Sequence, residues 1–190
     1  MKILRYGSTN TCFLEGGLLI DTDCAGKIQG FYRALKTQNL QLCDIRYVLA
    51  THYHPDHMGL IGTLMQQGVR LLLTEKQLCH VHDADYIYAR EKCTGFVPVD
   101  ESSADIISCA DSRAFLRTLG IDGEIISTPS HSPDSISVIL DSGICIVGDL
   151  EPLSYLAAYE DNAALQADWD RIRSFSPRRI IYAHANEQTL

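Results

Sequence analysis

The amino-acid sequence predicts an α/β fold with mixed β-sheets, built as one domain spanning residues 1–190. Three observations favour this class. Strand-like apolar runs alternate with segments of helical periodicity, the chain opens with a hairpin pattern, and no short-period repeat is visible. A chain of this length buries a substantial core without needing disulfides.

The first half of the chain supplies most of the predicted strands. Short apolar runs at 3–6, 12–15 and 18–21 predict strands, and Gly16-Gly17 between the last two indicates a hairpin turn. Helical spacing of apolar residues predicts a helix over 28–40. A strand is expected at 46–51, a short helix at 60–67 ended by Gly68, and a further strand at 69–73. Thr74 is expected to cap a helix that reaches Cys79.

The second half begins with a stretch that has few periodic cues, residues 80–103, which we interpret as an insertion or lid over a site. A helix is predicted over 111–119, closed by Gly120. Strands are predicted over 124–128, 135–140 and 143–149. An amphipathic helix over 162–175, built around Leu165, Trp169 and Ile172, precedes a final strand at 179–184.

The composition limits the classes of partner. The net charge of -8 argues against nucleic acid, and the arginines near 171–179 fit a solvated face. Seven cysteines, odd in number and without a CxxC pair, indicate reduced and mostly buried thiols. The N-terminal residues lack a signal-peptide pattern, and no apolar run is long enough for a membrane span. We therefore expect a cytoplasmic protein with no membrane partner; its oligomeric state is unknown.

The histidines carry the main functional prediction. His52, His54, Asp56 and His57 crowd directly behind an apolar strand, around Pro55. Imidazole nitrogens and carboxylate oxygens are ligands for zinc, iron and manganese. Alternate residues of an extended segment point the same way, so His52 and His54 can chelate one ion. Asp56 and His57, beyond the bend at Pro55, can turn toward a second ion.

Three further residues stand where predicted strands end. His131 lies in a loop between two strands, Asp149 follows a strand and a glycine, and His184 ends the last strand. Open α/β architectures build their sites at such strand exits. The remaining histidines, His80 and His82, fit a polar helix end better than a separate metal site, since no ligand cluster lies near them in sequence.

Four ordered elements of the chain resemble the metallo-β-lactamase superfamily. They are Thr51-His52-Tyr53-His54-Pro55-Asp56-His57-Met58-Gly59, Thr128-Pro129-Ser130-His131-Ser132-Pro133-Asp134-Ser135, Gly148-Asp149 and Tyr182-Ala183-His184, preceded by the opening hairpin. The resemblance implies an αβ/βα sandwich of two mixed sheets flanked by helices. It also implies that His52, His54 and His131 hold one metal, that Asp56, His57 and His184 hold a second, and that Asp149 bridges both.

The sequence departs from that family pattern in several loops. Leu60, Ser130 and Asp134 stand where glycines are common, and alanines flank His184. We expect these changes to affect loop shape and substrate access more than ligation. The sequence ends at Leu190, so the helical domain with which hydroxyacylglutathione hydrolases grip glutathione is not expected, and a glutathione thioester substrate is in doubt.

The seven residues predict a dinuclear metal-dependent hydrolase. Two divalent ions, zinc as first choice with iron or manganese also fitting, would supply a bridging hydroxide that attacks a small-molecule ester, thioester, lactone or phosphodiester. Asp56 is the predicted catalytic residue, orienting the nucleophile and moving its proton. Tyr155 and Tyr159 are candidates to donate to a developing oxyanion, although helix-surface roles fit them better.

Two alternatives remain open at this stage. One is a mononuclear iron-dependent oxidoreductase on the same fold, similar to a persulfide dioxygenase. The other is a non-catalytic module with a relic site. Metal content separates the first alternative from the hydrolase, and a substrate panel separates the second. The pocket walls are expected from residues 24–29, 86–99 and 150–161.

Overall fold

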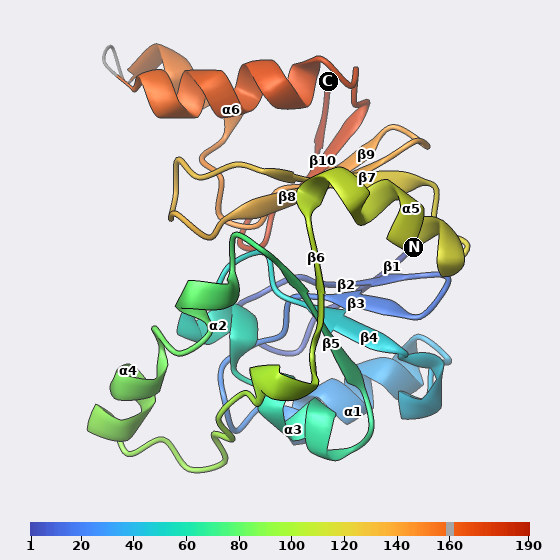
Figure 1. Cartoon of the computed structure of the whole chain (residues 1–190), viewed down its shortest axis with the longest axis vertical. Coiled ribbons are helices and arrows are strands. Elements are labelled where there is room, and N and C mark those ends of the chain that lie inside the picture. The colour runs from blue at the N-terminus through green and yellow to red at the C-terminus, as the bar shows by residue number, and fades with distance from the viewer. Residues whose placement is uncertain (159–161) are drawn as a thin grey trace.

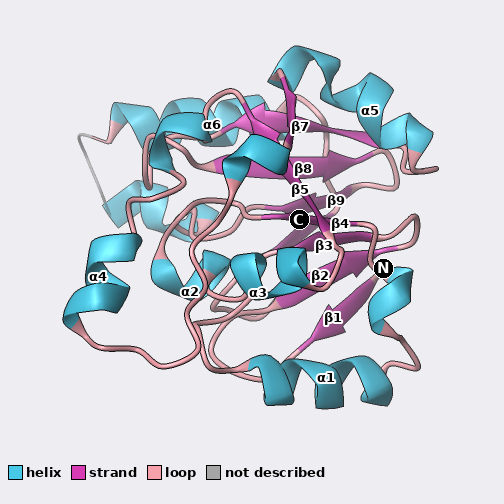
Figure 2. Cartoon of the chain, turned by 60° about the horizontal axis from the view of Figure 1, so that its bottom comes forward, coloured by secondary structure: helices cyan, strands magenta, loops and turns pink. Residues whose placement is uncertain are grey.

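The computed structural model, which describes residues 1–158 and 162–190, consists of two β-sheets packed face to face with helices on both outer sides (Figure 1). A second view shows the same layers (Figure 2). The predicted four-layer αβ/βα sandwich of mixed sheets is therefore confirmed.

The first sheet has the strand order β1-β2-β3-β4-β5-β6. Its strands are β1 (Lys2–Leu4), β2 (Thr11–Leu14), β3 (Leu18–Ile20), β4 (Tyr47–Leu49), β5 (Arg70–Thr74) and β6 (Asp105–Ile107). The hairpin of β2 and β3 pairs antiparallel, as predicted, and β3 through β6 run parallel. Because β3 and β4 are parallel, their C-terminal ends lie side by side at one end of the sheet. The segment 52–57, which carries the first four candidate ligands, begins there.

The second sheet has the order β11-β10-β9-β8-β7. Its strands are β7 (Gly123–Ser127), β8 (Ile136–Leu140), β9 (Ile144–Ile146), β10 (Arg179–Ile181) and β11 (Gln188–Thr189). Strands β9 and β10 are parallel, whereas the other pairs are antiparallel. The loops after β7, β9 and β10 carry the three later candidate ligands.

Six α-helices are described outside the sheets. They are α1 (Ile28–Thr37), α2 (Pro55–Met58), α3 (Ile61–Gln66), α4 (Asp85–Arg90), α5 (Ser112–Thr118) and α6 (Ala163–Arg173). Asn162 caps α6 by accepting a hydrogen bond from the Leu165 N–H, and Gly120 follows α5 with a φ of 74°. In both views α4 stands apart from the sheets, on the side of α2 (Figures 1 and 2). None of the described helices is long and apolar enough to cross a bilayer.

The side-chain alternation of the strands divides the core into layers. In β4, Val48 packs toward the helices below the first sheet, whereas Tyr47 and Leu49 pack between the two sheets. In β10, Ile181 enters that same middle layer, and Ile180 packs under α6 with the fully buried Trp169. Both sheets are therefore apolar on both faces, which explains why their strands read as continuous hydrophobic runs.

Several local predictions were wrong. Thr74 does not cap an α-helix; it ends β5, and its backbone N–H bonds to the Gln77 side chain within a turn. Strands β6 and β11 and the short helix α2 were not predicted. The cysteines are all free, but only Cys12 and Cys145 are buried.

Candidate metal centre

The first group of ligand atoms gathers where β4 leaves the first sheet. His52 and His54 occupy alternate positions of an extended segment, and their Nε2 and Nδ1 atoms lie 2.9 Å apart. His131, on the loop between β7 and β8, places its Nε2 atom 3.2 Å from the same Nδ1 atom of His54. Three imidazole nitrogens from two different sheets therefore converge on one point.

The second group forms because Pro55 begins α2. Proline is favoured at the first position of a helix, and Asp56 and His57 lie in the helical turn that follows it. The Nε2 atom of His184 lies 3.3 Å from His57 Nε2 and 3.1 Å from Asp56 Oδ2. Two imidazoles and a carboxylate thus face one another a short distance from the first group.

Asp149 lies between the two groups. Its Oδ1 atom is 3.3 Å from the Nε2 atoms of both His57 and His184. Its Oδ2 atom is 3.9 Å from His52 Nε2 and 3.8 Å from His131 Nε2. The Oδ1 atom is buried and has no hydrogen-bond partner. A buried carboxylate oxygen without a donor is costly unless a cation is near it.

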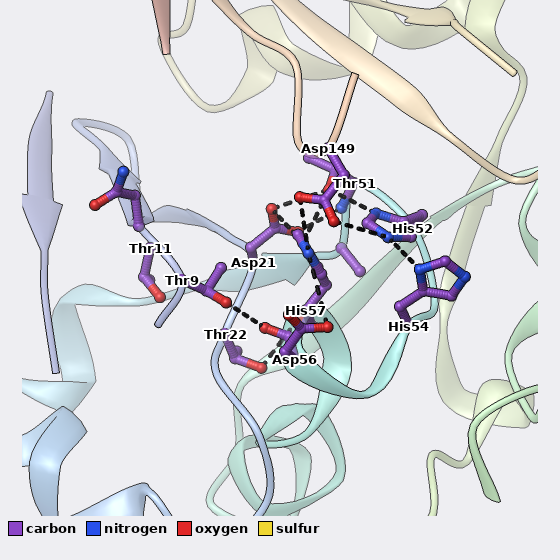
Figure 3. A network of polar contacts seen from close by, with 12 residues as sticks. Thr9, Thr11, Asp21, Thr22, Thr51, His52, His54, Asp56, His57 and Asp149 are labelled. Atoms are coloured by element: carbon purple, nitrogen blue, oxygen red, sulfur yellow. Dashed lines mark hydrogen bonds and ion pairs between the residues drawn. The ribbon is translucent and has the colours of Figure 1, made fainter. Parts of the chain in front are cut away.

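The donor set fits two divalent cations. Donor atoms in a tetrahedral zinc site lie about 3.4 Å from one another, given metal–ligand distances near 2.1 Å. Separations among the seven residues run from 2.9 Å, between His52 and His54, to 3.9 Å, between His52 and Asp149, and so bracket that value. The atoms of each of three overlapping trios of ligands lie within 4.8 Å of one another. All seven residues predicted from the sequence are brought together. Figure 3 shows five of them, with the Asp149 carboxylate above the imidazoles of His52 and His57.

A buried carboxylate behind the centre was missed by the sequence analysis. Asp21 is 2% exposed and accepts hydrogen bonds from the backbone N–H of Thr51 at 2.6 Å and from its hydroxyl at 2.9 Å. Its Oδ2 atom also lies 3.1 Å from His57 Nδ1 (Figure 3). A carboxylate on the far nitrogen of an imidazole fixes the tautomer in which Nε2 is free to bind a metal. The signal available in the sequence was an acidic residue at the end of a buried strand.

The local electrostatics separate the two groups. Burial and the neighbouring imidazoles of His57 and His54 lower the pKa of His52 to about 2, which keeps it neutral as a ligand must be. Burial also acts to lower the pKa of His57, but the carboxylates of Asp21 and Asp149 outweigh it and raise the pKa to about 10. The two carboxylates therefore favour positive charge at this position of the second group.

Comparison with known proteins agrees with this geometry. The family model of the metallo-beta-lactamase superfamily matches residues 5–184. This chain belongs to the metallo-beta-lactamase superfamily.

Two curated relatives share 25% identity with the chain. The beta-lactamase-like protein 2 homolog of Drosophila melanogaster aligns over 181 residues, 94% of this chain and 59% of the relative. A probable metallo-hydrolase of Methanocaldococcus jannaschii aligns over 153 residues, 78% of this chain and 70% of the relative. The chain therefore spans less than two thirds of the first relative and 70% of the second.

Three solved structures share the fold. The protein TTHA1623, crystallised in a di-iron-bound form, has a TM-score of 0.71 at 21% identity. The superposition covers 95% of this chain and 89% of TTHA1623. The BLEG-1 B3 metallo-beta-lactamase has a TM-score of 0.71 at 19% identity, with coverages of 99% and 93%. MIM-1 of Novosphingobium pentaromativorans has a TM-score of 0.65 at 21% identity, with coverages of 96% and 76%.

One departure from the superfamily pattern does more than change loop shape. Asp134, where the superfamily commonly has glycine, is 4% exposed and accepts hydrogen bonds from the Tyr53 N–H at 2.6 Å and the Ser132 hydroxyl at 2.7 Å. Tyr53 precedes His54, and Ser132 follows His131. Asp134 therefore links the backbones that carry two candidate ligands of the first group.

The remaining predicted site residues lie outside the centre. His80 and His82 bond to neighbouring carboxylates, and no trio of metal-ligating atoms forms around them among the described residues. Tyr155 is half exposed and lines neither cavity beside the centre. Tyr159 lies outside the described residues.

Proposed function

We propose that this superfamily member is a dinuclear metal-dependent hydrolase that acts on a small-molecule ester, thioester, lactone or phosphodiester. The observation that carries the proposal is the placement of Asp149. Each of its two oxygens faces imidazole nitrogens of a different group, and the buried Oδ1 atom lacks any other partner. A bridging carboxylate needs this arrangement, and a single-ion site does not.

The proposed ligand assignment follows the two groups. The first ion would be held by His52, His54 and His131, the second by Asp56, His57 and His184, and both by Asp149. When bound, two such ions supply a water of lowered pKa and a Lewis acid for the scissile carbonyl or phosphoryl group. Zinc, iron and manganese all accept nitrogen and carboxylate ligands of this kind, with zinc our first choice.

Asp56 is the proposed catalytic residue. Its side chain is 33% exposed, against 19% for Asp149, so it is the more accessible of the two candidate carboxylate ligands. It also lies close to His57 and His184. Its backbone carbonyl accepts a hydrogen bond from the Thr9 hydroxyl at 2.7 Å, which fixes the start of α2. An oriented carboxylate with one accessible oxygen can position an attacking water by accepting its hydrogen bond and can take up its proton.

Elemental analysis of untreated protein, followed by a panel of the four substrate types, tests this proposal. We expect two metal ions per chain and turnover of at least one type. One iron per chain would favour the alternative, a mononuclear iron-dependent oxidoreductase. Full metal content without cleavage of any substrate would favour a non-catalytic module.

The role of Asp56 needs a separate variant. Asp56→Asn should lower kcat by about 100-fold, the usual range for a positioned proton acceptor, while KM changes little. Asp170→Asn, on the exposed side of α6, is the matched control and should leave both constants unchanged. Turnover that is undiminished in Asp56→Asn protein holding both metals would contradict the assignment.

A further inference from the structure

Two cavities open on different parts of the proposed metal centre. The larger, of about 540 Å³, includes His54 and Pro55 in its wall and extends over His80, His82 and Tyr86. The smaller, of about 300 Å³, includes three candidate ligands in its wall: His131, Asp149 and His184. A linear substrate whose scissile bond lies at the ions would thus have one arm in each cavity.

Carboxylates on and behind the wall of the larger cavity pair with two of its histidines, His80 and His82. His80 Nδ1 lies 2.7 Å from Asp83 Oδ2, and the two nitrogens of His82 lie 2.9 Å from Asp85 and 3.0 Å from Glu101. Each of these two imidazoles is therefore matched by at least one carboxylate. Asp134 adds a further negative charge to the wall. Apart from the candidate ligand His54, the described wall offers no unpaired cationic side chain to an anionic arm of the substrate.

The wall of the smaller cavity is mostly apolar outside the ligands themselves. Leu150, Pro152 and Tyr182 line it, and among the described residues of this wall the charged side chain besides the ligands is that of Glu151. An arm of the substrate placed here meets hydrocarbon, a phenol and a carboxylate. Apolar groups gain free energy from such a wall, whereas a phosphate or carboxylate would lose hydration without gaining a partner.

Lysine and arginine are absent from the described lining of both cavities. The three residues outside the described part of the chain, 159–161, are Tyr-Glu-Asp and include no lysine or arginine. Sites that recognise phosphate or carboxylate groups generally use arginine, lysine or a helix N-terminus for that purpose. Arginine side chains of this protein form ion pairs away from the centre, for example Arg113 with Glu124 and Asp141.

From these walls we infer that both arms of the substrate are uncharged, without phosphate or carboxylate groups. The inference rests on the proposed hydrolase function and narrows it to substrates that carry no charge away from the scissile group. In a carboxylic ester or thioester of this kind, the bond that breaks joins the carbonyl carbon to the leaving oxygen or sulfur. Water supplies the new hydroxyl of the acid and the proton of the leaving group, so the products are a carboxylic acid and an alcohol or thiol.

A matched pair of substrates tests the inference on the metal-loaded protein. Para-nitrophenyl valerate and mono-para-nitrophenyl glutarate have the same leaving group and chain length, and differ by a terminal methyl against a terminal carboxylate. We expect kcat/KM to be at least about tenfold higher for the valerate ester, the effect of one unfavourable charge contact near a protein surface. Calorimetric titration with the corresponding para-nitroanilides, which hydrolyse slowly, should show the same order in Kd without turnover.

Two variants identify the wall that causes the discrimination. Tyr86→Lys places a cation on the rim of the larger cavity, at a side chain that is 65% exposed, and Glu151→Gln removes the charge of the smaller cavity. At least one should reduce the valerate preference by about threefold or more, according to which cavity receives the acyl arm. Ile106→Lys, also at an exposed position and lining neither cavity, is the control for net charge and should leave the preference unchanged.

The outcomes separate this inference from the proposed function. Equal or better cleavage of the glutarate ester, or a preference that neither variant reduces, would overturn the substrate class and leave the hydrolase intact. Cleavage of neither ester by protein that holds two ions would overturn the hydrolase function for acyl substrates. In that case equal binding of the two anilides would overturn the reading of the walls as well.

Discussion

Replacing Asp21, which contacts the proposed ligand His57 but is not itself a proposed ligand, tests quantitatively how the centre binds metal. Its backbone has a φ of 58°, a left-handed conformation that asparagine adopts nearly as readily as aspartate. Asp21→Asn therefore preserves the chain path and the side-chain volume. The amide oxygen can still accept the bond from the Thr51 N–H, but the amide nitrogen now stands where the carboxylate faced His57 Nδ1.

This exchange should reverse the tautomer of His57. A donor beside Nδ1 requires that nitrogen to accept, which moves the imidazole proton to Nε2, the atom that faces Asp149 and His184. Losing such a carboxylate partner typically reduces metal affinity by about 10–100-fold. That corresponds to about 1.4–2.8 kcal/mol of binding free energy. The cost should fall on the second ion, because His57 belongs to the second group.

Competition with a chromophoric chelator would resolve the two binding steps. The weaker affinity should appear in one step only, with the other, assigned to His52, His54 and His131, changed by no more than about threefold. Asp23→Asn is the matched control: Asp23 is also buried, in the same loop, but it accepts from the Thr9 and Cys24 backbone N–H groups and touches no histidine. Equal weakening of both steps, or equal weakening by Asp23→Asn, would refute the reasoning.

Three further predictions concern stability and titration. Gly148 has a φ of 59° and a Cβ there would collide with the Thr51 side chain, so Gly148→Ala should lower the free energy of unfolding by about 1–3 kcal/mol in urea titrations; an unchanged midpoint would contradict this. Burial acts to lower the pKa of His82, but its bonds to Asp85 and Glu101 outweigh it and raise the pKa above the ordinary 6.5. The stability from these contacts should thus be complete below pH 6.5 and lost as pH rises through the folded-state pKa; an NMR titration of His82 with a midpoint at or below 6.5 would show the sign to be wrong. Removing metal with a chelator should lower Tm, because an ion present at 100 times its Kd stabilises the folded state by about 2.7 kcal/mol; an identical Tm would exclude a bound ion.

The sequence was most informative where one local pattern decides the structure. The helices α1, α5 and α6 were predicted because their apolar residues repeat at helical spacing. The seven ligand candidates were predicted because histidine and aspartate cluster directly after one strand and recur at other strand exits, where open α/β folds build their sites. Their convergence depends on strand order, which the resemblance to a known family supplied and the residues alone did not.

The features that were missed depend on long-range partners. β6 is short and its pairing with β5 gives it no distinctive pattern of its own. The sequence analysis interpreted Asp134 as a change of loop shape. Its structural role depends on the hydrogen bond that it accepts from the backbone N–H of Tyr53, which is remote in sequence. Such contacts leave no spacing signal in a single sequence, since either partner alone fits an ordinary turn.

The two halves of the candidate centre belong to sheets that share no hydrogen-bonded strand. Four of its residues follow β4, and the other three follow strands of the second sheet. Under the proposed function, bound ions would therefore act as inorganic cross-links between the N-terminal and C-terminal halves of the chain. Removing the ions would then weaken the packing between the sheets as well as abolish catalysis. Backbone amide protons of the strands should then exchange with solvent faster, while those of α1 and α6 should change less.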